Sequence, residues 1–563
     1  MDKFFIEQHT SELSRPAWRL WLPCGPPFFS SLSMRRILPL LVAVCLAALL
    51  TGSVHAEESP RDVRVALFEY CQNVAWSYGH DGVPTTNSEV RAGPEPEAAA
   101  RSTDPDRDAF FLAGGREDRL GAFLDWAFLE RSVPGEFSFV AGFDRGGVIA
   151  ISDRGSEIRC LKRFDVAAGT VECLTPTNGW HDLLGPIFAE DTGSPCWRLA
   201  GVRWLDEHGP SNEWFDAAMA AAERRLCEAF PGCRPEWIEQ SPTSPDRWIV
   251  ECRFADRPPV WTETDVRSGS VRTLSRFGGN ISPMRREVFR WRARDGETVS
   301  GIVSLPGGDG PFPLVVFPHG GPGTLSDATF DERVWALVDS GFAVLQPNYR
   351  GSSGFGLEFR LDGWGADGIQ RALDDIFGMT EAVRGDARLP VASSKPVLLG
   401  GSWGGYCVLA LLARHPESCA GGVSFFGAFD LPALVAGEAE RIEKEGGRDR
   451  ETGKLALFRQ FGDPSDPSAM ARLADLSPVN RASDIAAPVV LCHNRGDTVI
   501  PFAQSEAMFA ALTNCASPVE LLAGDGCHGF SPAEEVDAYS SLARRFDLWI
   551  RAPATGRRPL AIR

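Results

Sequence analysis

A serine flanked by glycines, in the run Gly-Gly-Ser-Trp-Gly-Gly at residues 400–405, is the feature that most constrains the fold. Residues 396–399 before it have the composition of a short strand, and residues 407–415 after it form an apolar run with helical spacing. A serine that projects from a sharp strand-to-helix turn needs a strained backbone and neighbours without side chains. In this context the pattern Gly-x-Ser-x-Gly predicts a nucleophile elbow centred on Ser402. A glycine-rich turn that merely contains a serine is the alternative.

Strand-like and helix-like runs alternate from about residue 281 onward, which is typical of a parallel sheet covered by helices. The predicted strands are residues 313–317, 343–345, 397–399, 422–425, 489–492 and 519–522, and the predicted helices are residues 331–340, 370–383, 503–512 and 534–550. In such sheets the catalytic groups lie on loops at the carboxyl ends of the strands. The alternation and the elbow together predict an α/β-hydrolase domain over residues 281–550.

Two further residues follow predicted strands in the order that a hydrolase of this fold requires. Asp497 comes after the strand at residues 489–492, and His528 comes after the strand at residues 519–522. A serine hydroxyl is a weak nucleophile until a base takes its proton, and a carboxylate holds that base in the useful tautomer. A capping role for Asp497 and an ordinary loop position for His528 are the alternatives. Three such residues in this order at strand ends predict a triad of Ser402, Asp497 and His528.

A second glycine-rich loop predicts an oxyanion site. His-Gly-Gly-Pro at residues 319–322 follows the strand that ends at Phe317. Hydrolases of this fold place one backbone donor on such a loop and another on the residue after the nucleophile. The backbone N–H groups of Gly321 and Trp403 are therefore the predicted donors to a tetrahedral intermediate.

Composition and charge exclude some functions. The 563 residues are 44% hydrophobic and 23% charged, as expected of a soluble protein with more than one domain. A formal net charge of −18 argues against binding to nucleic acid or to an anionic membrane surface. The sequence has no Cys-x-x-Cys pair and no His-Glu-x-x-His run, so a zinc site has little support, and we expect no metal and no cofactor.

Residues 57–280 are rich in short β-like runs. The stretches 163–174 and 263–274 resemble each other, and each reads as a strand, a turn with Asp and Gly, and a second strand. Such hairpins are typical of propeller blades, which take roughly 40–45 residues each, so the region has room for about five. A small or incomplete β-propeller is predicted, with an irregular β-rich domain as the alternative. One helix is expected within it, at residues 214–230.

The beginning of the sequence has the pattern of an export signal. A short basic start at residues 34–36 precedes an apolar run, and Ala56 ends a small-x-small pattern. This predicts a signal peptide at residues 34–56 that is cleaved near Ala56. The apolar run is shorter than the ~18–20 residues that span a bilayer, which disfavours a membrane anchor. Residues 1–33 then read as a non-native upstream extension, and residues 551–563 as a C-terminal tail.

Export would remove Cys24 and Cys45 with the leader and permit disulfides among the other 12 of the 14 cysteines. Cys160 and Cys173 flank a predicted hairpin turn, and Cys227 and Cys233 bracket a Pro-Gly pair. These are two candidate pairs, but connectivity cannot be read from a sequence.

Together these motifs resemble the prolyl oligopeptidase family, in its acylaminoacyl-peptidase and dipeptidyl-aminopeptidase-like branch. Besides the elbow and the two triad loops, the matching stretches are residues 293–296, 319–322, 348–356, 364–365, 374–375, 461–464, 477–478 and 528–530. The resemblance covers residues 281–550 and also touches residues 214–277. It implies a serine peptidase that cleaves short peptides, with a propeller that restricts access to the site.

Departures from the family pattern bear on substrate binding. The family's propeller usually has about seven blades, more than residues 57–280 can supply at the length per blade given above. Many members carry Arg or Asn two positions after the triad acid to hold a substrate carbonyl, whereas this chain has Val499. Cys527 stands beside His528, where relatives often have another residue.

The sequence thus predicts an exported serine peptidase that hydrolyses oligopeptides through an acyl-enzyme. Arg350, Tyr406, Val499 and Ile500 are the candidate substrate contacts. A carboxylesterase with the same triad is the alternative, and a non-catalytic binding protein on a hydrolase scaffold is a third class. The expected partner is a peptide, with no nucleic acid and no membrane anchor in the mature chain, and the oligomeric state is left open.

Overall fold

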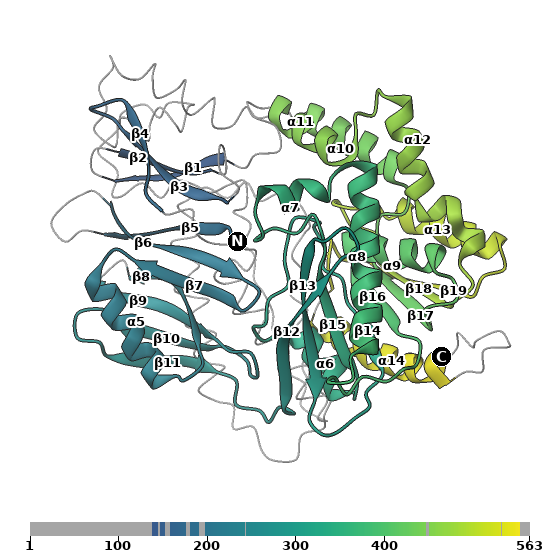
Figure 1. Cartoon of the computed structure of the whole chain (residues 1–563), viewed down its shortest axis with the longest axis horizontal. Coiled ribbons are helices and arrows are strands. Elements are labelled where there is room, and N and C mark those ends of the chain that lie inside the picture. The colour runs from purple at the N-terminus through teal and green to yellow at the C-terminus, as the bar shows by residue number, and fades with distance from the viewer. Residues whose placement is uncertain are drawn as a thin grey trace, which may run out of the picture. The chain divides into compact units, whose positions relative to one another are not determined.

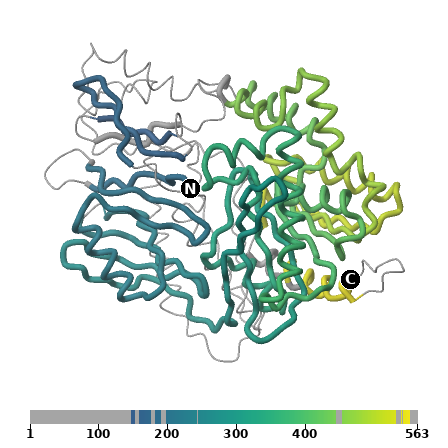
Figure 2. The backbone as a smooth tube through the Cα atoms, in the orientation of Figure 1, coloured from purple at the N-terminus to yellow at the C-terminus, as the bar shows by residue number. Residues whose placement is uncertain are grey.

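The computed structural model describes residues 138–144, 147–152, 158–175, 181–190, 197–241, 244–445, 450–530 and 532–551 (Figures 1 and 2). All of them belong to one compact unit, Val54–Arg563. The predicted upstream extension, the predicted signal peptide and the tail beyond residue 551 lie outside the described residues. So does the first part of the predicted β-rich region.

Three antiparallel sheets make up the described part of the β-rich region (Figure 1). The first contains β1 (Ser138–Asp144), β2 (Gly147–Ser152), β3 (Cys160–Asp165) and β4 (Thr170–Cys173). The second contains β5 (Leu183–Glu190), β6 (Trp197–Asp206) and β7 (Gly209–Trp214), and the third contains β8 (Arg234–Ser241), β9 (Ser244–Arg253), β10 (Val260–Asp265) and β11 (Val271–Arg276). In each sheet the strands pair with their neighbours in the sequence, which is the arrangement within a propeller blade. The prediction of a β-rich region built from blade-like units is confirmed.

The two stretches that resemble each other in the sequence form the same turn. Asp165 at the end of β3 and Asp265 at the end of β10 each accept hydrogen bonds from backbone N–H groups of the turn that follows. These hydrogen bonds lower the pKa of both carboxyls. Gly169 and Gly269 complete the turns, both with φ of +71°, a left-handed conformation that favours glycine.

The helix predicted within the β-rich region is α5 (Ala217–Ala229). Asp216 caps it, because its carboxylate accepts hydrogen bonds from two N–H groups of the first turn. The apolar face of the helix packs on the third sheet, and the buried side chains there are Met219, Ala222, Leu226, Trp237 and Trp248. The helix therefore serves packing, as its Ala-rich sequence indicates.

Neither candidate cysteine pair is a disulfide. The thiols of Cys160 and Cys173 bind different backbone carbonyls, because the register of β3 and β4 places Cys173 opposite Lys162. The Sγ atoms of Cys227 and Cys233 lie 3.8 Å apart, and both thiols are free. Closeness in the sequence therefore predicted proximity for the second pair only.

An eight-stranded sheet forms the second half of the chain, in the order β12-β13-β15-β14-β16-β17-β18-β19. Its strands are β12 (Met284–Arg292), β13 (Thr298–Pro306), β14 (Leu314–Val316), β15 (Ala343–Asn348), β16 (Val397–Gly401), β17 (Gly421–Phe425), β18 (Val489–Asn494) and β19 (Val519–Gly524). The strands from β14 to β19 run parallel, whereas β12 pairs with β13, and β13 with β15, antiparallel. The predicted α/β-hydrolase fold is confirmed, and every predicted strand is present.

The edge pair β12 and β13 is absent from the prediction. β12 reads Met-Arg-Arg-Glu-Val-Phe-Arg-Trp-Arg and lies at the edge of the sheet, where most of its residues keep some exposure. The central parallel strands are buried on both faces, and continuous apolar runs reveal such strands in a sequence. β13 is also buried along most of its length, but Ser300, Gly301 and Ser304 interrupt its apolar run. An edge strand rich in arginine gives a much weaker signal.

Helices cover both faces of the sheet (Figure 1). One core contains side chains from α8 (Gly365–Gly385), α9 (Trp403–Arg414) and α13 (Ala503–Asn514), and the other contains side chains from α6 (Glu332–Asp339) and α14 (Pro532–Arg551). Leu398 of β16 points to the first core and Leu399 to the second, because side chains alternate along a strand. The remaining helices are α7 (Leu357–Asp362), and α10 (Leu431–Glu445), α11 (Arg450–Phe461) and α12 (Pro467–Leu476) between β17 and β18.

Helix α8 is longer than the predicted helix at residues 370–383. Its first turn contains Gly365 and Gly368, and glycine weakens a helix in any estimate from sequence. A Cβ on Gly368 would lie 2.4 Å from the backbone of Gly363. The close approach of the Gly363 backbone therefore requires glycine at position 368, although glycine has a low helix propensity.

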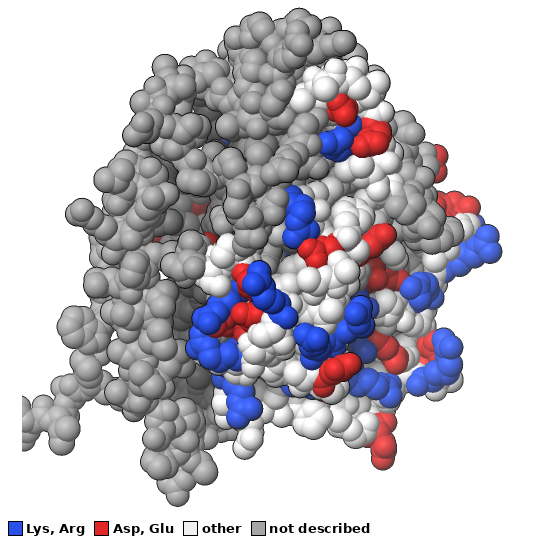
Figure 3. Space-filling view, turned by 90° about the vertical axis from the view of Figure 1, so that its left-hand side faces the viewer, with Lys and Arg blue, Asp and Glu red and all other residues white. Residues whose placement is uncertain are grey.

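Basic and acidic side chains are interspersed on the face shown in Figure 3. In the third sheet and its turns, Arg247 and Arg272 pair with Glu263, and Arg267 pairs with Asp246. Exposed pairs of this kind contribute little stability. They do, however, neutralise charge locally in a chain whose overall charge is strongly negative.

The guanidinium of Arg350 is buried after β15, where three carboxylates surround it. Its Nε and Nη2 donate to the two oxygens of Asp375 in α8 at 2.9 and 2.7 Å, and its Nη1 donates to Asp295 and Asp362. Burial alone would lower the pKa of this guanidinium, but the hydrogen bonds to Asp375 and Asp295 outweigh burial and raise it. Arg350 thus ties the loop after β15 to α8.

We expect Arg350→Met to destabilise the α/β domain by about 3–5 kcal/mol, because it leaves the buried Asp375 carboxylate without its counter-charge. Chemical denaturation followed by tryptophan fluorescence would measure this loss. Arg388→Ala is the control, since it removes only an exposed pair with Asp386 and should leave the denaturation midpoint unchanged. Equal shifts in the two variants would contradict a structural role for the Arg350 cluster.

Candidate active site

Ser402 lies at a sharp turn between β16 and α9. Its φ and ψ are +54° and −121°, in a region that residues with a side chain rarely adopt. Its N–H donates to the carbonyl of Phe425 in β17 at 2.9 Å, and its own carbonyl accepts from the N–H of Tyr406 at 3.1 Å. The strand, turn and helix around Ser402 have the arrangement that the elbow pattern predicts.

The glycines of the elbow have no room for side chains. A Cβ on Gly400 would lie 2.4 Å from the carbonyl oxygen of Gly404, and a Cβ on Gly404 would lie 2.2 Å from that of Pro318. A Cβ on Gly405 would lie 2.4 Å from the hydroxyl of Ser424. The turn therefore needs glycine at these positions, because the turn's own backbone, the Pro318 carbonyl and the Ser424 hydroxyl occupy the space that a Cβ would take.

The Asp497 carboxylate follows β18 and receives four hydrogen bonds. Its Oδ1 accepts from the N–H groups of Val499 and Ile500 at 2.8 and 2.9 Å. Its Oδ2 accepts from Nδ1 of His528 at 2.7 Å and from Nε2 of His493 at 3.2 Å. Burial alone would raise the pKa of this carboxyl, but the hydrogen bonds from His493, His528 and Ile500 outweigh burial and hold it well below its ordinary range. Asp497 is therefore a carboxylate at any pH near neutrality.

His528 follows β19 and keeps part of its ring exposed, at 23% of the side chain. The ring of Phe426 lies on it, with centroids 4.4 Å apart. The same Phe426 ring reaches the elbow, since a Cβ on Gly401 would lie 3.2 Å from it. Phe426 thus borders both the serine turn and the histidine. Cys527, beside His528, is disulfide-bonded.

The loop with the predicted oxyanion donor packs directly on the elbow. A Cβ on Gly320 would lie 3.5 Å from Cβ of Ser402. Tyr349 donates a hydrogen bond to the carbonyl of His319 at 2.7 Å, and Thr324 donates one to the carbonyl of Gly320, also at 2.7 Å. Burial lowers the pKa of His319 to about 4, so its ring is a neutral part of this anchor.

Both predicted donors have suitable positions in the backbone. Gly321 follows Gly320 in the anchored loop and has φ of +118°, which favours glycine. Trp403 begins α9, and the first N–H groups of a helix have no acceptor within the helix. Gly321 thus directly follows the glycine that packs on Ser402, and Trp403 directly follows Ser402 itself.

The candidate substrate contacts separate into two groups. Tyr406 is fully buried and donates to the carbonyl of Leu476 at 3.2 Å, and Arg350 is occupied by carboxylates. Their side chains are therefore interior groups, and the prediction that they contact substrate is corrected. Ile500 is also buried, whereas Val499 is 56% exposed beside the triad acid.

The sequence-based prediction omits Phe426, which contacts His528, and His493, which contacts Asp497 and the hydroxyl of Ser505. Phe426 has φ of +41° directly after β17, which no sequence pattern announces. His493 lies in β18, a fully buried strand. A histidine in such an apolar run needs buried polar partners. Its presence in the run could therefore have indicated that His493 is bound to other polar groups of the site.

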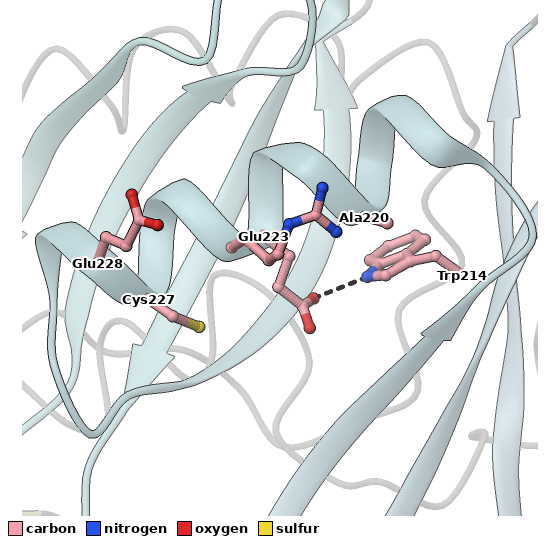
Figure 4. A pocket seen from close by; sticks show the side chains of 6 residues that line it. Trp214, Ala220, Glu223, Cys227 and Glu228 are labelled. Atoms are coloured by element: carbon pink, nitrogen blue, oxygen red, sulfur yellow. Dashed lines mark hydrogen bonds between the residues drawn. The ribbon is translucent and has the colours of Figure 1, made fainter.

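A separate pocket of about 480 Å³ lies along α5 (Figure 4) and is lined by Trp214, Ala220, Glu223, Arg224, Cys227 and Glu228. Oε2 of Glu223 accepts hydrogen bonds from Asn212, Trp214 and Trp237, which join the helix to the strands beside it. Burial nevertheless raises the pKa of Glu223. No nucleophile and base are paired among the residues that line this pocket. Nor do the described residues contain a group of three or more His, Cys, Asp or Glu side chains placed to hold a metal ion.

We expect Gly404→Ala to prevent labelling of Ser402 by a serine-reactive phosphonate and to lower the melting temperature. Its Cβ would collide with the backbone carbonyl of Pro318, and overpacking of this kind costs about 1–3 kcal/mol or more. Gly437→Ala is the matched control, because that glycine is also helical and a Cβ there would meet nothing within 4 Å. Normal labelling of Gly404→Ala would contradict this prediction, since it would show that the loop with Pro318 can move away from the added Cβ while Ser402 stays reactive.

Comparison with known proteins finds similarity chiefly in the second half of the chain. Residues 328–550 match the prolyl oligopeptidase family. Dipeptidyl aminopeptidase BIII of Pseudoxanthomonas mexicana is 28% identical over 471 residues, which cover 79% of this chain and 64% of that protein. The acylamino-acid-releasing enzyme of Homo sapiens is 28% identical over 280 residues, which cover 48% of this chain and 35% of that enzyme. The chain thus spans less than two thirds of the length of these relatives.

Solved structures share the fold. The acylaminoacyl peptidase of Pyrococcus horikoshii superposes with a TM-score of 0.56 at 18% identity, over 74% of this chain and 64% of that one. A puromycin-hydrolyzing peptidase of Mycobacterium tuberculosis superposes with a TM-score of 0.57 at 21% identity, over 76% of this chain and 63% of that one. The fold, the serine turn and the sequence match thus agree that residues 328–550 are similar to the prolyl oligopeptidase family.

Proposed function

We propose that the chain is a serine peptidase that hydrolyses short peptides through an acyl-enzyme. The observation that carries the proposal is the hydrogen bond of 2.7 Å between Nδ1 of His528 and the carboxylate of Asp497, combined with the strained turn at Ser402. The three residues follow β16, β18 and β19, which are parallel strands of one sheet. Their functional groups therefore belong to the same edge of the sheet, where enzymes of this fold carry their chemistry.

The proposed reaction assigns one task to each residue. His528 takes the proton of the Ser402 hydroxyl as its oxygen attacks the substrate carbonyl, and it later gives that proton to the leaving amine. The Asp497 carboxylate holds the histidine tautomer and stabilises the imidazolium that forms. The N–H groups of Gly321 and Trp403 receive the developing oxyanion, and each such donor is worth about 3 kcal/mol. A water molecule then attacks the acyl-enzyme, with His528 again as the base, and releases the second product and free Ser402.

Peptides are the preferred substrate class because the similar proteins are named as peptidases, among them a dipeptidyl aminopeptidase and an acylaminoacyl peptidase. A carboxylesterase is the second candidate, since the same triad attacks esters. Val499 supports a difference in substrate binding from relatives that carry a cation or an amide at that position. Its side chain is exposed beside the triad acid and offers apolar surface but no hydrogen-bond donor.

We also propose that the protein is exported. The basic start, apolar run and small residues at positions 34–56 support this. Among the described residues, no helix is both long and apolar enough to cross a bilayer. N-terminal sequencing of the mature protein is expected to begin near Glu57, and a mature chain that retains residues 34–56 would contradict export by cleavage.

Covalent labelling tests the proposed function. A fluorescent phosphonate is expected to label the wild-type protein, and Ser402→Ala is expected to lose both the label and peptide hydrolysis. His528→Ala should lose turnover about as completely, because members of a triad act as a unit. Turnover of a peptide amide and of a short acyl ester by the same preparation distinguishes a peptidase from an esterase. Persistent turnover in Ser402→Ala would overturn the proposal.

The pH profile is a second arm of this test. The pKa of Asp497 is depressed, so its ionised form and the stability it contributes persist until the pH falls through that low value. A histidine must be neutral to act as a base, and histidine is the side chain type that ordinarily changes its charge between about pH 5 and 8. We expect kcat/KM to rise with pH in this range, and a flat profile would count against His528 as the base.

A further inference from the structure

His493 contacts the same carboxylate oxygen as His528, yet the reaction described above gives it no task. The side chain lies at the end of β18 and is fully buried. Its Nε2 is 3.2 Å from Oδ2 of Asp497 and 3.0 Å from the carbonyl oxygen of Ile500. Its Nδ1 is 2.8 Å from the hydroxyl of Ser505 in α13. The ring therefore connects the triad acid to a neighbouring helix.

The partners of His493 define its tautomer. A carboxylate and a backbone carbonyl can only accept hydrogen bonds, so Nε2 must carry the hydrogen. In a neutral ring Nδ1 then accepts, and the Ser505 hydroxyl is the donor beside it. Both ring nitrogens are satisfied although the side chain is excluded from water, as a buried histidine requires.

Ile500 links His493 to the other oxygen of the same carboxylate. The Ile500 carbonyl accepts from His493, and the Ile500 N–H donates to Oδ1 of Asp497 at 2.9 Å. Both backbone groups of Ile500, its N–H and its carbonyl, are therefore held by hydrogen bonds, and they fix the loop after Asp497. His493 and Ile500 together fix the two oxygens of Asp497 in place.

We propose that His493 is a positioning residue for the triad: its Nε2–H holds the Asp497 carboxylate where Oδ2 receives Nδ1 of His528. This inference rests on the proposed serine peptidase function, and it deepens it. His493 touches no reacting atom and acts only through Asp497. An ordinary core histidine would contribute packing, for instance against the ring of Phe502 at 5.4 Å, and would leave the chemistry unchanged.

Two amide variants separate these roles. In His493→Gln the side-chain amide extends about as far as Nε2 of histidine, so it still donates to Asp497. In His493→Asn the amide stops near the position of Nδ1, so it reaches Ser505 but not Asp497. Gln504→Leu is the matched structural control. Gln504, in α13, is buried like His493, but its side chain makes hydrogen bonds to the backbone of Phe429 and Asp430 and not to Asp497.

The experiment uses the full-length protein and a fluorescent phosphonate. The final extent of labelling counts the folded sites, so kcat is expressed per labelled site, and the labelling rate reports activation of Ser402. We expect His493→Asn to lower kcat and the labelling rate about 10- to 100-fold with KM within about twofold, as for loss of a hydrogen bond to a charged group. His493→Gln should stay within about fivefold of wild type, and Gln504→Leu should lower the melting temperature but not kcat per site.

Each outcome decides the matter. A normal kcat per site in His493→Asn would mean that the residue only packs, and equal loss in Gln and Asn would mean that reach to Asp497 is irrelevant; either overturns the proposal. If His493→Asn does not fold, a drop of more than about tenfold per site in His493→Gln would overturn it as well. Failure of wild-type protein to label at Ser402 would reject the peptidase function itself, and the role of His493 with it.

Discussion

The backbone of Ser402 is the constraint on which the rest of the α/β domain depends. A residue with φ of +54° is held there only if its surroundings leave no better conformation. Here the hydrogen bond to Phe425 in the neighbouring strand, the carbonyl of Pro318 against Gly404, and the start of α9 act together. Three segments must therefore meet before the turn can form: β17, the loop that contains Pro318, and the start of α9.

The sequence predicts this half of the chain well because its signals are strong and local. Buried parallel strands such as β16 and β18 are continuous apolar runs, and the elbow needs glycines at fixed positions. Asp497 and His528 each follow a predicted strand, and both of these strands are present. β12 escapes the prediction because an edge strand can alternate charged and apolar residues, and α8 is longer than predicted because Gly368 is needed for close packing.

The errors in the site prediction have a common physical cause. Arg350 and Tyr406 have chemistry that suits substrate binding, but the fold uses them inside, one for carboxylates and the other for the Leu476 carbonyl. Residue type indicates what a side chain can bind and not what surrounds it. The reverse error concerns His493 and Phe426, whose contacts with the triad arise from long-range packing that no short pattern records.

The order in which the site is supplied along the chain has a consequence for synthesis in the cell. Ser402 and its glycines emerge from the ribosome first, Asp497 follows with β18, and His528 comes only with β19, the last strand of the sheet. Until β19 has paired with β18, Ser402 lacks its proposed base and the Asp497 carboxylate lacks one of its four hydrogen bonds. On the proposed mechanism, an incomplete nascent chain that lacks β19 therefore has no base to activate Ser402 and does not hydrolyse neighbouring chains.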